Sequence, residues 1–401
     1  MNNNKNLEIT FYINPINKFD LTQFQKEYPE FSNIKILENN NIFNNIIECF
    51  GTIQTLCRKN SNDNLFKKIC RFLIIRIIKI LNLNEFEYIL TTKELEKFNT
   101  FFSPCYKIPG IIAKNKNIIN FTMLHDITPL VVPEYNQIIT AKNSWFKKLF
   151  KSLNPNDYYF ANSEYTKQDF INHCKNINPN HITTALLGAS ENFCPIITKE
   201  KWIRIKEKYN IPKDKKFVFS LCTIEPRKNL IFAIKNFIKF IKKNNIEDLI
   251  FVLGGGHWQS FSDKFNKEIE TIGDYKSKII FTDYIADEDL ATLYNASEIF
   301  VYTSLYEGFG IPILEAMQCG CACITSNVTS IPEVIGDAGI QINPKSDEEM
   351  IDAYKKMYYD ADFKNQCKQK ALERAKQFSW QKCGNIITER IIEVVRKETK
   401  N

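Results

Sequence analysis

The stretch Ser304-Leu-Tyr-Glu-Gly-Phe-Gly-Ile-Pro-Ile-Leu-Glu-Ala-Met317 places two carboxylates eight positions apart, on either side of a glycine-flanked turn. The short apolar segment before it, Glu298–Thr303, predicts a buried parallel strand. Pro312 suits the first position of a helix, where its missing N–H costs nothing. We expect Glu315 to fall in the first turn of this helix, where the positive end of the helix dipole would keep it ionised. Glu307 would then lie on the loop at the carboxyl end of the strand, where open α/β sheets bind ligands.

The two glutamates suit a ligand rich in hydroxyl groups, such as a sugar or a ribose, because a carboxylate accepts hydrogen bonds. A plain structural interpretation is also open. A strand, a glycine-rich turn and a helix occur in any α/β protein, and two glutamates at this spacing arise by chance. The spacing alone does not decide between these two interpretations.

Length and patterning indicate a two-domain α/β protein. The 401 residues are enough for two cores of ordinary size, and a composition of 44% hydrophobic and 25% charged residues is that of a globular protein. Short apolar segments that alternate with helical ones predict parallel, doubly wound sheets. The predicted strands are Leu7–Ile13, Asn117–Leu124, Asp157–Ala161, Lys216–Cys222, Asp248–Leu253, Lys278–Phe281, Glu298–Thr303, Ala322–Thr325 and Gly339–Ile342. We place the domain boundary between residues 197 and 198 and expect a ligand cleft between the two halves.

Two further turns carry groups that suit phosphate. Arg227 and Lys228 follow a predicted strand and open a helix, so charge and backbone N–H groups converge there as in a diphosphate site. A solvated charged turn is the alternative. Gly254-Gly255-Gly256 also follows a strand, and Gly255 would let the backbone approach a phosphate, although turns of this kind are common.

Histidine, aspartate and cysteine offer fewer signals. His125 ends a predicted strand of the amino-terminal half and could face the cleft from the opposite side; a packed or surface histidine is the alternative. Asp287-Glu-Asp289 contains the D-x-D pattern of some metal sites, but we interpret Asp287 as a helix N-cap. The twelve cysteines lack zinc-ligand spacing, which indicates reduced, mostly buried thiols and no metal site.

The formal charge of +7 is concentrated in residues 58–79 and 142–151, and the second segment interleaves lysines with aromatic residues. Such segments either lie on an anionic membrane surface or form an ordinary solvated helix face, and both interpretations stay open. Nucleic acid is not an expected partner, because no recognition motif accompanies the charge. The chain lacks a signal-peptide layout and an apolar run of the ~20 residues that span a bilayer, so we expect a cytoplasmic protein, with the inner face of the cytoplasmic membrane as a further location.

The glutamate stretch resembles the signature of the retaining, nucleotide-sugar-dependent glycosyltransferases of family 4. Two other blocks are similar to that family: Glu225-Pro-Arg-Lys-Asn229 and Thr122-Met-Leu-His-Asp-Ile-Thr-Pro-Leu-Val-Val-Pro-Glu134, the latter preceded by Phe102-Ser-Pro104. The resemblance implies the GT-B fold, in which two Rossmann-like domains with parallel sheets face each other across a cleft. These would be residues 1–197 on the acceptor side and 198–379 on the nucleotide-sugar side, with a closing helix at 380–401 that packs back on the first domain.

The same resemblance implies roles for particular residues. Arg227 and Lys228 would contact the donor diphosphate, and Glu315 the ribose hydroxyls. Glu307 would hold the transferred sugar, and His125 would act near the reaction centre from the other domain. The remaining donor-binding residues would be Gly308, Phe309 and Gly310 for the sugar, Tyr284 and Ile285 for the base, and Gly255 for a phosphate. No metal and no other cofactor is expected. The turn Asn14–Lys18 differs from the glycine-rich loop that the family has at this place. The acceptor site is therefore the part of the family's site that the resemblance assigns least to this sequence.

The predicted function is transfer of a hexose from a nucleoside-diphosphate sugar to a glycan or lipid-linked acceptor in surface polysaccharide or lipopolysaccharide biosynthesis. The resemblance favours mannose as the hexose and GDP-mannose as the donor. Two alternatives stay open. A nucleotide-sugar epimerase of the same fold would act without an acceptor. A non-catalytic nucleotide-sugar-binding protein would bind the donor without hydrolysing or transferring it.

Overall fold

The computed structural model describes residues 10–11, 35–36, 95–132, 144–195, 198–256 and 259–398. The chain divides into two compact units: Met1–Phe101 with Ile108–Asn120, and Phe102–Lys107 with Phe121–Asn401. This division differs from a boundary at residues 197 and 198, which stays a prediction. The basic segment 58–79 and the turn Asn14–Lys18 lie outside the described residues.

The described part of the first unit is small. Strand β1 (Thr10–Phe11) lies within the predicted strand Leu7–Ile13 and pairs in parallel with β2 (Lys35–Ile36). Helix α5 (Gly110–Ala113) follows an extended Pro109. The apolar side chains of this unit form a separate buried cluster, which consists of Leu95, Ile108, Ile112 and Ile118 with Phe101 packed against them.

A four-stranded sheet has the order β3-β4-β5-β6. Its strands are β3 (Thr100–Ser103), β4 (Ile119–Leu124), β5 (Tyr158–Ala161) and β6 (Ile182–Thr184), and the β4–β5 and β5–β6 pairs are parallel. The helices of this region are α6 (Thr128–Val131), α8 (Trp145–Ser152), α9 (Glu164–His173) and the 3-10 helix η4 (Pro179–His181). Ser163 caps α9, because its Oγ accepts a hydrogen bond from the N–H of Thr166.

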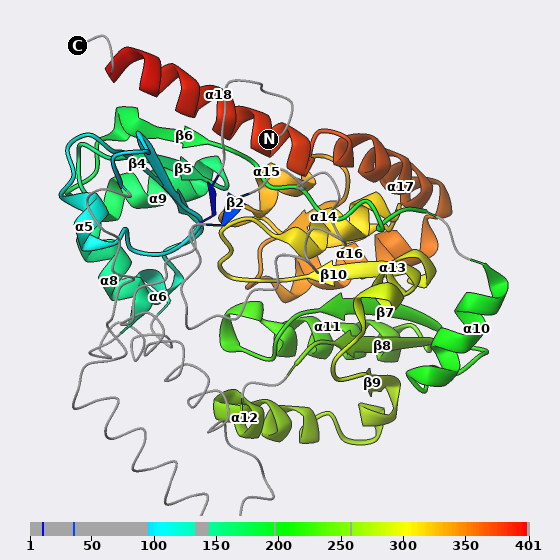
Figure 1. The fold of residues 1–401 in the computed structure, drawn as a ribbon. Helices are drawn as coiled ribbons and strands as arrows, with labels where there is room; N and C mark the ends of the chain where they lie inside the picture. Colours follow the sequence, from blue (N-terminus) through cyan, green and yellow to red (C-terminus); the bar gives the residue numbers. More distant parts are fainter. Residues whose placement is uncertain are drawn as a thin grey trace, which may run out of the picture. The chain divides into compact units, whose positions relative to one another are not determined.

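A six-stranded parallel sheet has the order β12-β11-β10-β7-β8-β9. Its strands are β7 (Lys216–Leu221), β8 (Leu249–Gly254), β9 (Ile279–Phe281), β10 (Ile299–Tyr302), β11 (Cys323–Ser326) and β12 (Ile340–Ile342). The chain starts in the middle at β7, runs outward to β9, and returns to β10 beside β7. In Figure 1 this reversal is visible as a change from green β7 to yellow β10 across the sheet. Ligands of doubly wound sheets bind at such a reversal, and the predicted parallel sheet is confirmed.

Helices alternate with the strands of this sheet. They are α10 (Lys199–Lys208), η5 (Pro226–Lys228), α11 (Leu230–Lys243), α12 (Gln259–Glu270), η6 (Gly273–Lys278), α13 (Asp287–Ala296), α14 (Ile311–Gln318), α15 (Ile331–Ile335), α16 (Asp347–Tyr359) and α17 (Ala361–Ala375). Phe237 and Phe240 of α11 are fully buried and lie against the ring of Tyr354 on α16. Each buried aromatic ring stabilises this packing by about 2 kcal/mol.

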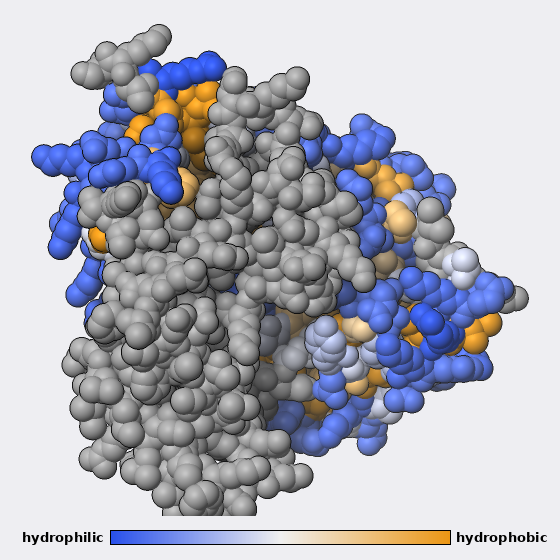
Figure 2. All heavy atoms as spheres, viewed as in Figure 1, coloured by the Kyte–Doolittle hydropathy of each residue, from blue (hydrophilic) through white to orange (hydrophobic). Residues whose placement is uncertain are grey.

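The last helix, α18 (Trp380–Glu398), packs on the four-stranded sheet. The Tyr158 hydroxyl of β5 donates a 2.8 Å hydrogen bond to Glu398, and the Arg390 guanidinium lies 5.8 Å from the Tyr158 ring centroid. Figure 2 shows that the described surface on the visible face is mainly hydrophilic, with small separate hydrophobic patches. Among the described residues, no helix is long and apolar enough to cross a membrane.

Candidate active site

Two loops meet at the carboxyl ends of the neighbouring strands β7 and β10. After β7 the chain forms η5, which ends at Asn229 in the left-handed conformation with φ 55°. After β10 it forms the glycine-flanked turn that leads into α14. The N–H of Leu305 donates a 2.7 Å hydrogen bond to the carbonyl of Arg227 and so joins the two loops. Arg227, Lys228 and Glu307, which the sequence predicts for the site, therefore lie where the strand order reverses.

Glu307 lies at the centre of a buried ionic cluster. Its Oε1 accepts hydrogen bonds from Lys228 Nζ at 2.6 Å and from the Tyr302 hydroxyl at 2.8 Å. Its Oε2 accepts from Arg227 Nη1 at 2.7 Å. Arg227 Nη2 also pairs with Glu225 at 2.9 Å. With both carboxylates ionised, two cations are balanced by two anions.

The burial and the charges of this cluster fix its protonation. Burial alone would raise the pKa of Glu307, but the Lys228 and Arg227 cations outweigh burial and lower that pKa to about 2. Burial would lower the pKa of Lys228, and the Glu307 carboxylate reverses this and holds it well above its ordinary value. At neutral pH Glu307 is thus an anion that accepts hydrogen bonds and has no proton to donate.

The structure brings together three residues predicted for the site and adds two that sequence reasoning missed. Arg227, Lys228 and Glu307 meet as expected, but the direct pairing of Glu307 with both cations was not predicted. Tyr302 and Glu225 complete the cluster. Glu225 belongs to the same Glu-Pro-Arg-Lys block as Arg227, and this position in the block could have marked it as part of the site. Tyr302 ends an apolar strand, and no pattern in the sequence marks its hydroxyl as part of the site.

The predicted position of Glu315 is wrong. Helix α14 begins at Ile311 after Gly310, whose φ is +108°, so Glu315 is the fifth residue and lies in the second turn. Burial raises its pKa, whereas the hydrogen bond from the Tyr294 hydroxyl, 2.8 Å from Oε2, lowers it. The environment of Glu315 is therefore set by burial and by Tyr294 rather than by the helix dipole. Its side chain is half-buried and can still accept hydrogen bonds from a ligand.

Helix α9 holds the glycine turn. The carbonyl of Gly308 accepts hydrogen bonds from Ser163 Oγ at 2.7 Å and from Thr166 Oγ1 at 3.1 Å. A Cβ on Gly308 would lie 2.1 Å from the carbonyl oxygen of His125, so only glycine fits there. Buried Phe309 follows, and its carbonyl accepts a hydrogen bond from Ser330 Oγ at 3.1 Å. The turn is fixed by contacts with residues far away in the sequence.

The structure places the backbone of His125 against the turn that carries Glu307. Its carbonyl accepts a 3.2 Å hydrogen bond from Thr166 Oγ1, and its exposed imidazole has Nε2 2.8 Å from the carbonyl of Pro104. A catalytic role for the imidazole stays a prediction. Sequence reasoning missed Tyr306, whose hydroxyl accepts a 3.4 Å hydrogen bond from the N–H of Ile127 and donates one of 2.5 Å to Asp169.

The other predicted donor residues lie at the end of β8 and after β9. Gly255 has φ +125°, and a Cβ there would lie 2.1 Å from the carbonyl oxygen of Cys222, which gives this glycine a structural reason. Its N–H donates a 2.9 Å hydrogen bond to the carbonyl of Asp283. Tyr284 is exposed, and Ile285 is buried against Gly254. Contacts of these residues with a nucleotide stay predictions.

The acidic residues of α13 have structural partners. Ala286, not Asp287, is the N-cap, so that prediction is wrong by one position; Asp287 begins the helix. Asp289 is buried and accepts hydrogen bonds from Lys208 at 2.5 Å and from the Tyr209 hydroxyl at 2.9 Å. Within the described ranges, no three His, Cys, Asp or Glu residues gather in a way that could hold a metal ion.

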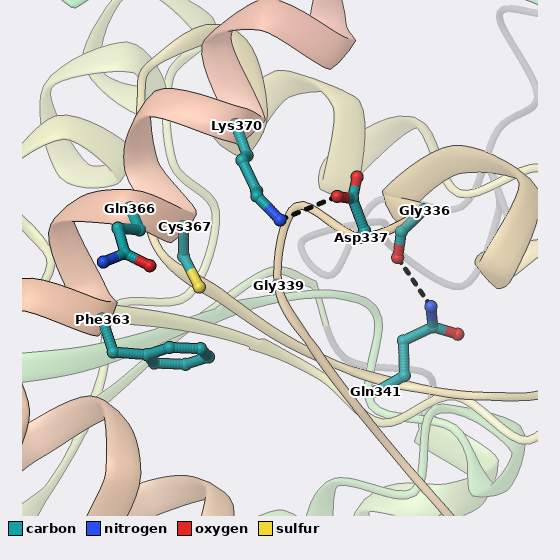
Figure 3. Close-up of a pocket in the computed structure, with 8 residues that line it drawn as sticks. All are labelled: Gly336, Asp337, Gly339, Gln341, Phe363, Gln366, Cys367 and Lys370. Atoms are coloured by element: carbon teal, nitrogen blue, oxygen red, sulfur yellow. Dashed lines mark hydrogen bonds and ion pairs between the residues drawn. The ribbon is translucent and has the colours of Figure 1, made fainter.

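A separate hollow of about 540 Å³ lies between α17 and the turn that joins α15 to β12 (Figure 3). Phe363, Cys367 and Lys370 line it from α17, and Lys370 pairs with Asp337 at 2.8 Å. None of the residues predicted for donor binding lines this hollow. We therefore place the candidate site at the ionic cluster, where the charges and the reversal of strand order coincide.

Comparison with solved structures identifies the class of the fold. The structure of HepE from Anabaena in complex with UDP and glucose superposes with a TM-score of 0.64 at 14% identity, covering 94% of this chain and 90% of HepE. The two sheets are those of the GT-B fold, and the predicted fold class is confirmed.

Sequence comparison identifies the family. Residues 203–374 match the model of the glycosyl transferases group 1. O-antigen chain mannosyltransferase B of Escherichia coli is 32% identical over 263 residues, which are 65% of this chain and 67% of that protein. Serotype-specific mannosyltransferase WbdA of Escherichia coli is 31% identical over 273 residues, which are 66% of this chain and 32% of WbdA. The chain thus spans about a third of the length of WbdA. It belongs to the group 1 glycosyl transferases, as the resemblance to family 4 predicted.

Proposed function

We propose that this chain is a retaining glycosyltransferase that moves a hexose from a nucleoside-diphosphate sugar to a glycan or lipid-linked acceptor in surface polysaccharide biosynthesis. Mannose, carried by GDP, is the favoured sugar, because the two similar relatives are named mannosyltransferases. One observation carries the proposal. Arg227, Lys228 and Glu307 form a buried ionic cluster at the reversal of strand order in the six-stranded sheet.

Arg227 is suited to contact the donor diphosphate. Its guanidinium carries five N–H donors, and three are used in the contacts with Tyr306, Glu307 and Glu225. Among the described residues this leaves two donors, on a side chain that is 18% exposed. Lys228 lies deeper and adds charge. Cations that stabilise the departing diphosphate more than the bound donor lower the barrier to transfer.

Glu307 is suited to orient groups rather than to exchange protons. Its low pKa makes it a weak base, and its two oxygens are already paired with Arg227, Lys228 and Tyr302. Both properties make it a poor covalent nucleophile. We therefore propose substitution at the front face of the sugar without a covalent enzyme intermediate, with Glu307 holding the two cations and accepting from a sugar hydroxyl.

A transfer assay tests the proposal. Thermal shifts with GDP, UDP and ADP identify the base, and GDP-mannose is then offered with and without mannose-containing acceptors. Arg227→Ala should lower transfer by orders of magnitude, each tenfold corresponding to about 1.4 kcal/mol of barrier. Near-normal transfer by this variant would contradict the role of Arg227. Product analysis without acceptor separates an epimerase, and a donor-hydrolysis assay separates a non-catalytic binding protein. We expect EDTA to leave transfer unchanged.

We further propose a cytoplasmic location with peripheral contact at an anionic membrane. The support is the charge of +7 and the lysines of α8, which include Lys147 and Lys151. Sedimentation with vesicles that contain anionic lipid tests this contact. Binding that weakens in high salt and in Lys147→Glu/Lys151→Glu supports it, and equal recovery in the supernatant with and without vesicles refutes it.

A further inference from the structure

Two large aromatic rings lie together on the surface near the candidate site. Tyr106, in the loop after β3, is 61% exposed, and Trp145, the first residue of α8, is 53% exposed. Their ring centroids are 6.3 Å apart and their planes are inclined at 75°. We call this pair the aromatic corner. An edge-to-face pair of this kind presents two nearly perpendicular walls to a ligand.

Both rings are held in place by the chain around them. The buried Ser103 Oγ accepts a 3.0 Å hydrogen bond from the N–H of Tyr106 and donates one of 2.6 Å to its carbonyl. Trp145 makes an edge contact with the buried ring of Phe146, 5.9 Å away between centroids. A corner that is ordered before binding loses little conformational entropy on binding.

The aromatic corner is close to the predicted reaction centre. Pro104, whose carbonyl is 2.8 Å from His125 Nε2, is two residues before Tyr106, so their Cα atoms are at most about 7.6 Å apart. From the side of Trp145, Phe146 belongs to the same buried cluster as Tyr306, the neighbour of Glu307. Tyr106 is thus two residues from the carbonyl that contacts His125, and Trp145 packs on a ring of the buried cluster that contains Tyr306.

We propose that the aromatic corner binds a sugar ring of the acceptor, beside the sugar that is transferred. A pyranose presents a face of C–H groups with partial positive charge, which suits the negative face of an aromatic ring. Two inclined walls fix both the face and one edge of such a ring. This proposal rests on the proposed glycosyltransferase function and adds the acceptor subsite, for which the sequence offered no residue.

A membrane lipid is the other kind of ligand that exposed tyrosine and tryptophan side chains bind. The geometry of α8 favours the sugar. Interfacial helices insert an apolar face into the lipid, but the apolar residues Phe146 and Leu149 of α8 are buried in the core of the protein. Only the ring of Trp145 projects from this helix beside its lysines, which is a small area for insertion.

Trp145→Ala, Trp145→Phe and Tyr106→Ala test the proposal, and the chain offers matched controls. Trp380 is 53% exposed and Tyr359 is 59% exposed, and both lie on other helices. With GDP-mannose as donor and mannobiose as acceptor, we expect Trp145→Ala and Tyr106→Ala to raise the acceptor KM about tenfold, which is about 1.4 kcal/mol. Trp145→Phe should recover part of this loss. The GDP Kd should stay unchanged in all variants, and Trp380→Ala and Tyr359→Ala should keep the wild-type KM.

A second measurement does not depend on transfer. Titration with mannobiose should change the tryptophan fluorescence of the wild type and of Trp380→Ala, and this change should vanish in Trp145→Ala. An acceptor KM within twofold of the wild type in Trp145→Ala would overturn the proposal, and so would an unresponsive wild-type fluorescence. Loss of vesicle binding in that variant with an unchanged KM would assign the corner to lipid instead. A wild type that neither binds GDP nor transfers sugar refutes the proposed function, while the fluorescence titration still decides whether the corner binds sugar.

Discussion

Replacing Glu307 by glutamine removes one charge from the centre of the ionic cluster and keeps the shape of the side chain. Lys228 is buried and would lose the anion that compensates it, and Arg227 would keep only Glu225. Breaking a buried ion pair from one side costs about 3–5 kcal/mol. The glutamine oxygen still accepts one of the three hydrogen bonds, so we expect a loss of about 3 kcal/mol in the free energy of unfolding.

The pKa of Glu307 leads to the same magnitude and adds a pH dependence. A pKa lowered from 4.5 in the unfolded chain to about 2 in the folded protein contributes about 3 kcal/mol of stability. Because the folded pKa is the lower one, this contribution is present above pH 4.5 and is lost as the pH falls towards 2. The difference in stability between the wild type and Glu307→Gln should therefore be constant above pH 4.5 and shrink below it.

The nucleotide should respond in the opposite direction. Without Glu307, the two cations are balanced by one carboxylate, so the GDP Kd should stay the same or fall while transfer falls. Thermal melts with and without GDP measure both effects in one assay. Glu268→Gln is the matched control, since Glu268 pairs with Lys235 at 2.6 Å on the exposed surface, where a pair contributes less than ~1 kcal/mol. A Glu307→Gln variant that melts like the wild type and binds GDP more weakly would refute this reasoning.

Three smaller changes test the rest of the site. Because Glu315 would bind the ribose as an anion, GDP binding should weaken as the pH falls through the raised pKa of Glu315. Tyr294→Phe removes the hydrogen bond that lowers this pKa, so it should move the midpoint of a titration of the GDP Kd against pH upward. An unmoved midpoint would argue against the pairing of Tyr294 with Glu315. Gly308→Ala should cost at least ~2 kcal/mol in thermal melts and abolish transfer, because its Cβ would meet the backbone of His125; wild-type behaviour would contradict the close approach. Tyr306→Phe leaves a buried carboxylate without its donor and should cost about 1–3 kcal/mol of stability with an unchanged GDP Kd, whereas a weaker Kd would place this tyrosine in the donor site.

The sequence predicted the elements of the site better than their mutual contacts. The strand before Glu307 and the turn at Arg227 are where the apolar patterns and the charges indicated. Local patterns carry no information about strand order, so the position of β10 beside β7 was not predictable from them. The pairing of Glu307 with Lys228 follows from that strand order, because it brings together loops that are 79 residues apart.

Glu315 shows a second limit of sequence reasoning. A dipole argument applies within the first turn of a helix, and an error in the starting position removes its basis. Helix α14 begins at Ile311, and the decisive partner of Glu315 is a hydroxyl from α13. The contacts of α9 with the glycine turn were unpredictable for the same reason, since Ser163 and Gly308 are 145 positions apart.

The hydrogen bonds between α9 and the glycine turn have a consequence for recombination between members of this family. Gly308 is held by Ser163 and Thr166 and touches His125, so four positions on both sides of residue 197 must match one another. A chimera that exchanges residues 198–379 with a relative separates these partners. Hybrids should therefore fold and function better when the donor of the carboxyl-terminal half also supplies α9 and the loop of His125. An exchange of sugar specificity between such enzymes would then require that several linked segments are exchanged together, and not one domain alone.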